Sequence, residues 1–226
     1  MGQGISAVLT FAIGVAISPV PIIAVILMLF SQRARVNGPA FLAGWVIALA
    51  ALSTIVYVVS HDGNVATSST ASDSVSWGKI VLGVALLALA RRNWRKRPAP
   101  GEEAAMPKWL ASVESVSPVK AFGLAVLLAA VNPKNLILTL GAAAGLAQVQ
   151  GLSTTDAIVA IAVFVVISSL TIAGPVLYAL FGGEKARATL DSAKEWLTTH
   201  NAAVMSVLFL VFGVDLIAKG LPPLAH

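Results

Sequence analysis

The segment AAVNPKNLILTL, residues 129–140, carries the strongest indication of how this chain folds. It lies within a long apolar stretch, yet Asn132, Pro133, Lys134 and Asn135 follow one another near its start. A proline inside a helix removes a backbone hydrogen bond and clashes with the preceding turn. The segment therefore predicts an interrupted helix whose freed backbone groups need other partners.

The surrounding sequence is typical of an integral membrane protein. Of its 226 residues, 58% are hydrophobic and 11% are charged, and the mean hydropathy is +0.88. A soluble domain is about half apolar and about a quarter charged. A membrane-spanning helix needs roughly 20 apolar residues. The sequence predicts six such segments, at residues 4–30, 38–60, 77–90, 119–148, 156–181 and 201–221.

The Lys and Arg residues predict the orientation of these segments. The first, third and fifth connections, near residues 31–37, 91–120 and 182–196, hold 12 of the 15 basic residues. The second and fourth connections, residues 61–76 and 149–155, hold none. By the positive-inside rule, the odd connections are cytoplasmic. We therefore expect a multi-pass protein of the inner (plasma) membrane with both termini extracytoplasmic.

The chain divides into two halves around a charged linker. Residues 91–117, which include RRNWRKRPAP, separate a first three-helix repeat at 1–90 from a second at 118–226. Because each half holds three spans, the halves enter the membrane from opposite sides and form inverted repeats. The expected fold is all-α, with six transmembrane helices as 3+3 inverted repeats and with helices 1 and 4 broken at proline.

The two breaks occupy equivalent places in the two halves. An offset of 114 aligns SPVPIIAVILMLF, which starts at Ser18, with NPKNLILTLGAAA, which starts at Asn132. Non-helical backbone at this depth is tolerated where it is buried in protein or lines a wet cavity. Paired breaks between inverted repeats are typical of a transporter's central site. The predicted substrate-binding residues are Ser18, Pro19, Pro21, Asn132, Pro133, Lys134 and Asn135.

The chemistry at these breaks favours an anionic ligand, but a simpler interpretation stays open. Helix N-termini attract negative charge, and Lys134 adds a positive charge at the same level. In the alternative, each proline only kinks its helix and Lys134 extends its amine to the membrane interface. The matched pair of breaks together with Lys134 favours the site.

Several classes of chemistry are excluded or disfavoured by the sequence. The chain has no cysteine, so it has no disulfide, thiolate metal ligand or cysteine nucleophile. It contains no Ser/His/Asp set and no nucleotide-binding motif, so we expect no enzyme activity, no cofactor and no nucleic-acid partner. Asp215 is the one acidic residue well inside an apolar segment, and Lys219 follows four residues later. This spacing favours a local ion pair over a metal site.

Other residues have structural roles as their first interpretation. Gly44 is expected to allow close helix packing. Ser168, Ser169 and Thr171 are expected to bond back to helix carbonyls, with the lining of a path as the alternative. The segment EKARATLDSAKEWLTT, residues 184–199, is expected to form a short interfacial helix before the last span.

Three stretches together resemble a known family. They are SPVPIIAVILMLFS, ARVNGPAFLAGWVIAL and NPKNLILTLGAAAGLAQ. They resemble the GAP or Sap-like family, the glycopeptidolipid and sulfolipid addressing proteins of the LysE transporter superfamily. The resemblance covers nearly the whole chain. It implies a 3+3 transporter-like fold and a role in moving cell-envelope glycolipids or other solutes outward.

Two functions follow from these features. The first is a transporter that exports or translocates an envelope glycolipid or another small anionic solute, with membrane lipids as partners. The alternative is a non-transporting accessory subunit that assists a larger lipid exporter. Gly141 and Gly145 form a small-residue face that suits packing within the bundle or a homodimer. Lipid movement by the purified protein alone distinguishes the two functions.

Overall fold

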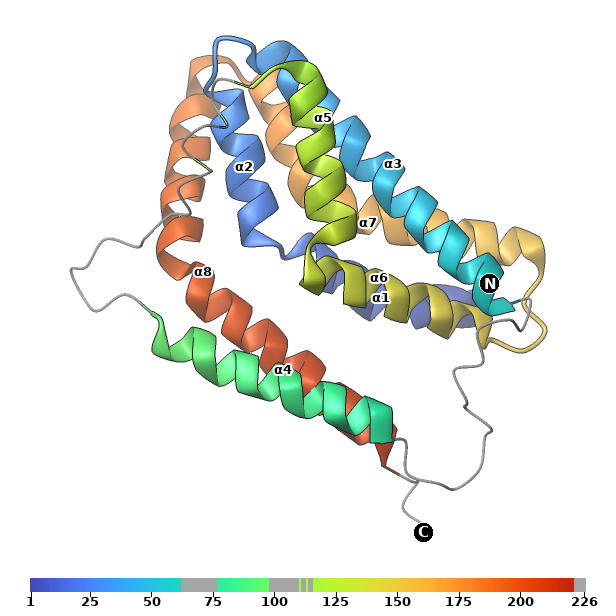
Figure 1. Cartoon of the computed structure of the whole chain (residues 1–226). Coiled ribbons are helices and arrows are strands. Elements are labelled where there is room, and N and C mark those ends of the chain that lie inside the picture. The colour runs from blue at the N-terminus through green and yellow to red at the C-terminus, as the bar shows by residue number, and fades with distance from the viewer. Residues whose placement is uncertain (62–76, 98–109, 111–112, 114–115, 222–226) are drawn as a thin grey trace. The chain divides into compact units, whose positions relative to one another are not determined.

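The structure is a computed structural model that describes residues 1–61, 77–97, 110, 113 and 116–221. Within these ranges it is all-helical, with no strand (Figure 1). Most of the proposed linker at 91–117 lies outside the described residues. The helices are α1 (Gly2–Ala16), α2 (Pro19–Leu29), α3 (Ala34–His61), α4 (Trp77–Arg95), α5 (Pro118–Val126), the π-helical turn η2 (Leu127–Val131), α6 (Pro133–Ala147), α7 (Thr154–Phe181) and α8 (Gly183–Gly220).

Several of these helices are suited to crossing a membrane. α3, α7 and the Lys185–Ala218 part of α8 are each long and apolar enough. Counting each of two bent helix pairs as one span raises the number to five. α4 is not among them, because its 19 residues include Lys79 and three arginines. The chain is therefore a multi-pass membrane protein with three to five candidate spans, against the six expected from its sequence.

The last helix differs from its prediction. Residues 184–199 and the span expected at 201–221 form one helix, α8, of 38 residues. The prediction of a separate interfacial helix is therefore wrong. The physical reason is that no proline or glycine lies between Lys185 and Phe212, so nothing stops the helix at the change from polar to apolar sequence.

The helices form two compact units. Unit 1 comprises Met1–Val65 and Met106–Glu195, and unit 2 comprises Ala66–Ala105 and Trp196–His226. In unit 1, α1 packs on α6 and α7, while α3 packs on α5, α6 and α7. α2 is buried along 10 of its 11 residues. Its sequence is apolar on every face, as is usual for a helix inside a large core.

Glycines mark the closest helix contacts. A Cβ atom at Gly44 would lie 2.5 Å from the carbonyl oxygen of Phe122, so α3 and α5 approach closely only because residue 44 lacks a side chain. The packing role predicted for Gly44 is confirmed. In unit 2, a Cβ atom at Gly83 would lie 2.7 Å from the Gly213 oxygen, and one at Gly213 would lie 3.0 Å from the Gly83 oxygen.

Candidate functional site

Both predicted helix breaks are present. α1 ends at Ala16 and α2 begins at Pro19, with a bend of 54° between them. The second break separates the α5–η2 segment from α6, which begins at Pro133, and the bend is 62°. Both prolines occupy the first helical position, where a missing N–H costs least and the fixed φ suits a helix start. Each proline thus begins the second half of a broken helix.

The two breaks contact each other through Ser18 and Asn135. The Ser18 hydroxyl lies 2.8 Å from Asn135 Oδ1 and 2.7 Å from the Val15 carbonyl oxygen, and its single proton serves one acceptor at a time. Asn135 Nδ2 donates to the carbonyl oxygen of Leu128 in η2 at 2.9 Å. Both polar side chains are buried. Asn135 therefore connects the first break with the end of the helix before the second.

Lys134 also crosses from the second break to the first. Its ammonium donates to the carbonyl oxygens of Gly14 at 2.8 Å and Ile17 at 2.7 Å, and its side chain is 7% exposed. Carbonyls at a helix C-terminus lack intrahelical donors, and the helix dipole there favours a cation. Lys134 therefore caps α1, a helix of the other half of the chain. Two of its three N–H donors are used in this way.

Hydroxyl groups of α7 also donate to carbonyl oxygens of α1. Thr171 Oγ1 donates to the Ala16 carbonyl oxygen at 2.6 Å, and Ser168 Oγ donates to that of Ala12 at 3.4 Å. Ser169 bonds back within its own helix to Val165 at 2.6 Å. The expectation of local bonding thus holds for Ser169, whereas Ser168 and Thr171 reach α1. Their spacing of one helical turn is the sequence signal that they share a face.

The helix N-termini at the breaks offer fewer donors than the sequence suggested. Pro19 and Pro21 have no N–H groups, so Val20 supplies the remaining donor in the first turn of α2. In α6, the Lys134 N–H donates to the Asn132 side-chain oxygen at 3.1 Å. A cradle of backbone N–H groups around an anion is therefore not formed here. The attraction for a negative group comes mainly from the Lys134 ammonium.

One buried polar group near the breaks was missed by the sequence reasoning. Thr139 lies on α6 four residues after Asn135, on the same face. Its hydroxyl is buried and has no hydrogen-bond partner among the described residues. Such a group is costly in an apolar interior unless water or a ligand reaches it. Thr139 is therefore an additional candidate for contact with a ligand.

In the described part of the chain, no group of three or more His, Cys, Asp or Glu residues is placed to hold a metal ion. The side chain of Lys219 lies outside the described set, so its pairing with Asp215 stays a prediction.

The family model described as "Sap, sulfolipid-1-addressing protein" matches residues 8–222. The chain belongs to the Sap family. No curated protein and no solved structure matches it. The Sap match includes both helix breaks, Lys134 and the α7 hydroxyls, so the whole candidate site lies within the sequence shared with the Sap family. Membership of the wider LysE superfamily stays a prediction.

Proposed function

We propose that this Sap-family protein is a transporter that moves an anionic envelope lipid, or a small anionic amphiphile, past the meeting point of its two helix breaks. The observation that carries the proposal is the position of Lys134. Its ammonium is buried against neutral carbonyls and forms no ion pair with a described carboxylate. An uncompensated cation in a membrane interior costs roughly 3 kcal/mol. An anionic ligand would offset that cost, and the sulfolipid in the family's name has suitable chemistry.

The capping of α1 suggests how a ligand would act. A negative group near Lys134 competes with the carbonyls of Gly14 and Ile17 for the ammonium. When the ammonium turns to the ligand, the end of α1 loses its cap and the contact between the breaks weakens. A ligand shifts a conformational equilibrium only by its differential affinity for the two states. In this scheme the difference is the charge-assisted contact with Lys134, which favours the state with separated breaks.

We also propose that the two halves of the chain are inverted repeats, and the pairing of the helices supports this. α3 and α7 each have 28 residues, and α3 packs on α5 as α7 packs on α1. Unit 2 joins the third helix of the first half, α4, with the last part of α8. There, Gly83 and Gly213 each face the other's carbonyl oxygen, so α4 and the last part of α8 approach closely. We propose six spans, with α4 as a short span in locally thinned bilayer.

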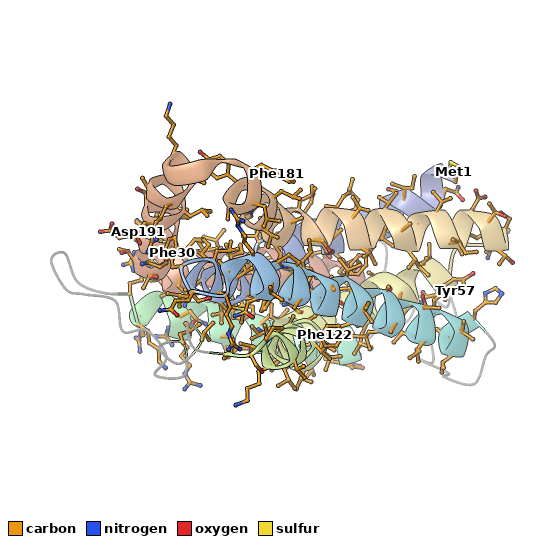
Figure 2. The ribbon with its side chains drawn as sticks, turned by 90° about the horizontal axis from the view of Figure 1, so that it is seen from above. Met1, Phe30, Tyr57, Phe122, Phe181 and Asp191 are labelled. Carbon is orange, nitrogen blue, oxygen red and sulfur yellow. The ribbon has the colours of Figure 1, made fainter. Side chains whose placement is uncertain are left out.

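Three contacts support the proposed topology. The Asn37 side chain donates to the Val116 carbonyl oxygen at 3.0 Å, which joins the first and third connections. The Arg187 guanidinium lies 5.6 Å from the Phe30 ring centroid, which joins the fifth connection to the first. The N-terminal amine lies 3.1 Å from Asp156 at the start of α7. Figure 2 shows Phe30 and Asp191 at one end of unit 1 and Met1 at the other. The end that gathers the basic connections would be cytoplasmic.

Single cysteines introduced into this cysteine-free chain test the topology. A cysteine at Gln150, in the exposed turn between α6 and α7, should react with a membrane-impermeant maleimide on intact cells. A cysteine at Arg95 should react only after the cells are permeabilised. Labelling of position 95 but not 150 on intact cells would reverse the orientation and remove the basis for a cytoplasmic basic face.

Transport by the purified protein tests the function itself. The protein is reconstituted into liposomes that contain a fluorescent phosphatidylglycerol, and bleaching by external dithionite reports the movement of lipid between leaflets. We expect faster movement than in protein-free liposomes, with a smaller effect on fluorescent phosphatidylcholine because Lys134 selects for negative charge. Movement no faster than in protein-free liposomes would favour the accessory-subunit alternative.

A further inference from the structure

A second candidate binding site lies where the end of α2 meets the start of α8. A pocket of about 420 Å³ is lined by Phe30, Arg187, Ala188 and Asp191. Its volume is within the range of small-ligand sites, which is roughly 300–1,000 Å³. Phe30 follows the last residue of α2, whereas the other three residues lie on one face of α8. We call this cavity the Phe30 pocket.

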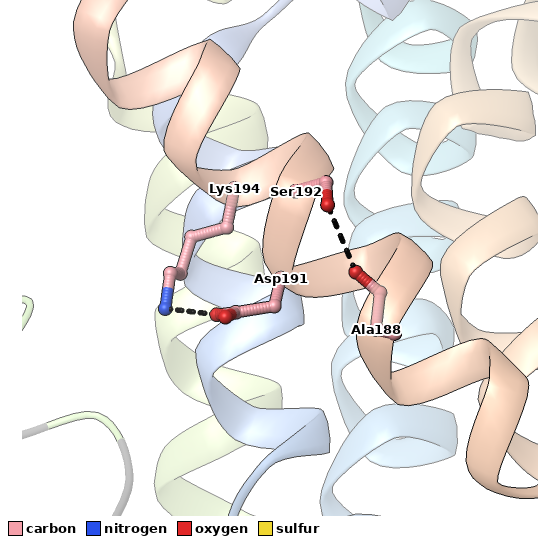
Figure 3. A network of polar contacts seen from close by, with 4 residues as sticks. All are labelled: Ala188, Asp191, Ser192 and Lys194. Atoms are coloured by element: carbon pink, nitrogen blue, oxygen red, sulfur yellow. Dashed lines mark hydrogen bonds and ion pairs between the residues drawn. The ribbon is translucent and has the colours of Figure 1, made fainter.

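Of the two charged side chains that line the Phe30 pocket, Asp191 forms an ion pair with a described residue and Arg187 does not. Lys194 Nζ lies 2.6 Å from Asp191 Oδ1, so the one described carboxylate that lines the pocket is already engaged (Figure 3). The Ser192 hydroxyl donates to the Ala188 carbonyl oxygen at 3.1 Å and is likewise engaged. Arg187 forms no ion pair with a described carboxylate, and its guanidinium rests over the Phe30 ring. Counting the described residues alone, the pocket therefore keeps one positive charge that an anion can neutralise.

The surroundings of the pocket are typical of a membrane–water interface. The Tyr178 hydroxyl near the end of α7 lies 3.5 Å from the Thr189 hydroxyl on α8, and Phe181 is 84% exposed. Exposed aromatic side chains at the ends of membrane helices are typical of the headgroup level. Arg33 and Arg35, just beyond Phe30, are also exposed and add positive charge. An anionic headgroup would thus meet cations while its acyl chains meet apolar side chains.

We propose that the Phe30 pocket binds the anionic phosphate or sulfate ester headgroup of a membrane lipid, with Arg187 as the contacting cation. A planar guanidinium can donate two parallel hydrogen bonds to such a group, and the Phe30 ring below restricts its orientation. This inference goes beyond the proposed function, because the binding of a headgroup here is measurable without transport.

Lipid binding to charge-neutralised variants tests the proposal. Detergent-solubilised protein is titrated with dioctanoyl-phosphatidylglycerol, and native mass spectrometry reports the dissociation constant. Arg187→Gln should weaken binding roughly tenfold, the effect of losing one charge-assisted hydrogen bond. Lys185→Gln removes an exposed cation of the same helix that does not line the pocket, so it should change binding by less than about twofold. Asp191→Asn should strengthen binding, because it removes the one described negative charge that lines the pocket.

Two comparisons decide the outcome. Equal binding by the Arg187→Gln and Lys185→Gln proteins would overturn the assignment of the pocket. Displacement of the lipid by equimolar inorganic sulfate would also overturn it, because the site would then serve a free anion. Selective lipid binding by a protein that moves no lipid would remove the proposed function and leave the pocket proposal standing. Intact transport together with equal lipid binding by the Arg187→Gln and Lys185→Gln proteins would remove the pocket proposal and leave the proposed function standing.

Discussion

Replacement of Lys134 by alanine should lower lipid transport roughly tenfold or more, the effect of losing one charge-assisted contact with the ligand. The same change should also lower the thermal stability of the protein. It leaves the carbonyl oxygens of Gly14 and Ile17 without their donor. The Gly14 contact is buried, and an unsatisfied buried carbonyl costs about 1–3 kcal/mol. Transport must therefore be measured per folded molecule, with the melting temperature determined on the same preparation.

Two further variants separate the charge of Lys134 from its capping role. Lys134→Arg keeps the charge but changes its geometry, so it should retain part of the transport activity. Thr171→Val removes one donor to the Ala16 carbonyl, which still accepts from the backbone N–H of Ser18 at 2.9 Å. It should lower stability slightly and reduce transport much less than Lys134→Ala does, because Thr171 offers no charge to an anionic ligand. A Lys134→Ala protein that melts at a lower temperature yet transports at the wild-type rate would limit Lys134 to capping.

The helix breaks could be predicted from the sequence because their cause is local. Pro19 and Pro133 cannot continue a helix from the preceding turn, and Asn132 is a favourable residue just before a helix start. The alignment of Ser18 with Asn132 also placed both breaks correctly, since each residue directly precedes the first helical residue of its segment. Apolar runs and missing charges were likewise sufficient to predict a membrane protein.

The partners of the polar groups could not be predicted, because they depend on packing between distant segments. Lys134 reaches carbonyls about 120 positions earlier in the chain, and Thr171 reaches one 155 positions earlier. Neither distance leaves a periodic pattern in the sequence. From the sequence, the helix N-termini at the breaks were expected to bind an anion because of the helix dipole, but the structure forms no cradle of backbone N–H groups there. The same prolines that break the helices remove the N–H groups that such a site would use.

The predicted helix boundaries were wrong where hydropathy and helix propensity disagree. The polar start of α8 suggested a separate helix that ends before the apolar span. The residues around His200, where the boundary was expected, include no proline or glycine, so the helix continues through them. α4 posed the opposite problem, because its apolar run ends in a cluster of arginines and is shorter than α3, α7 and α8. Charge-rich ends shorten the apolar length of a helix without ending its hydrogen bonding.

A disulfide between the two breaks is the most direct test of the central claim that they separate during transport. The side chains of Ser18 and Asn135 are in contact, with 2.8 Å between Ser18 Oγ and Asn135 Oδ1, an atom one bond beyond the place of a cysteine sulfur, and the chain has no other cysteine to interfere. Cysteines at both positions should form a disulfide on mild oxidation, which is measured as the loss of reactive thiols. Ser18→Cys alone should be insensitive to the oxidant and serves as the matched control.

The measurement compares lipid transport by the oxidised and reduced forms of the same double variant in liposomes, read by extraction of the fluorescent lipid with albumin because dithionite would reduce the disulfide. The account predicts that oxidation stops transport and that dithiothreitol restores it, because the disulfide holds the breaks together while Lys134 stays on the carbonyls of α1. Transport at equal rates by the cross-linked and reduced proteins would contradict the account. It would mean that the contact between Ser18 and Asn135 is a fixed part of the fold and that lipid passes elsewhere.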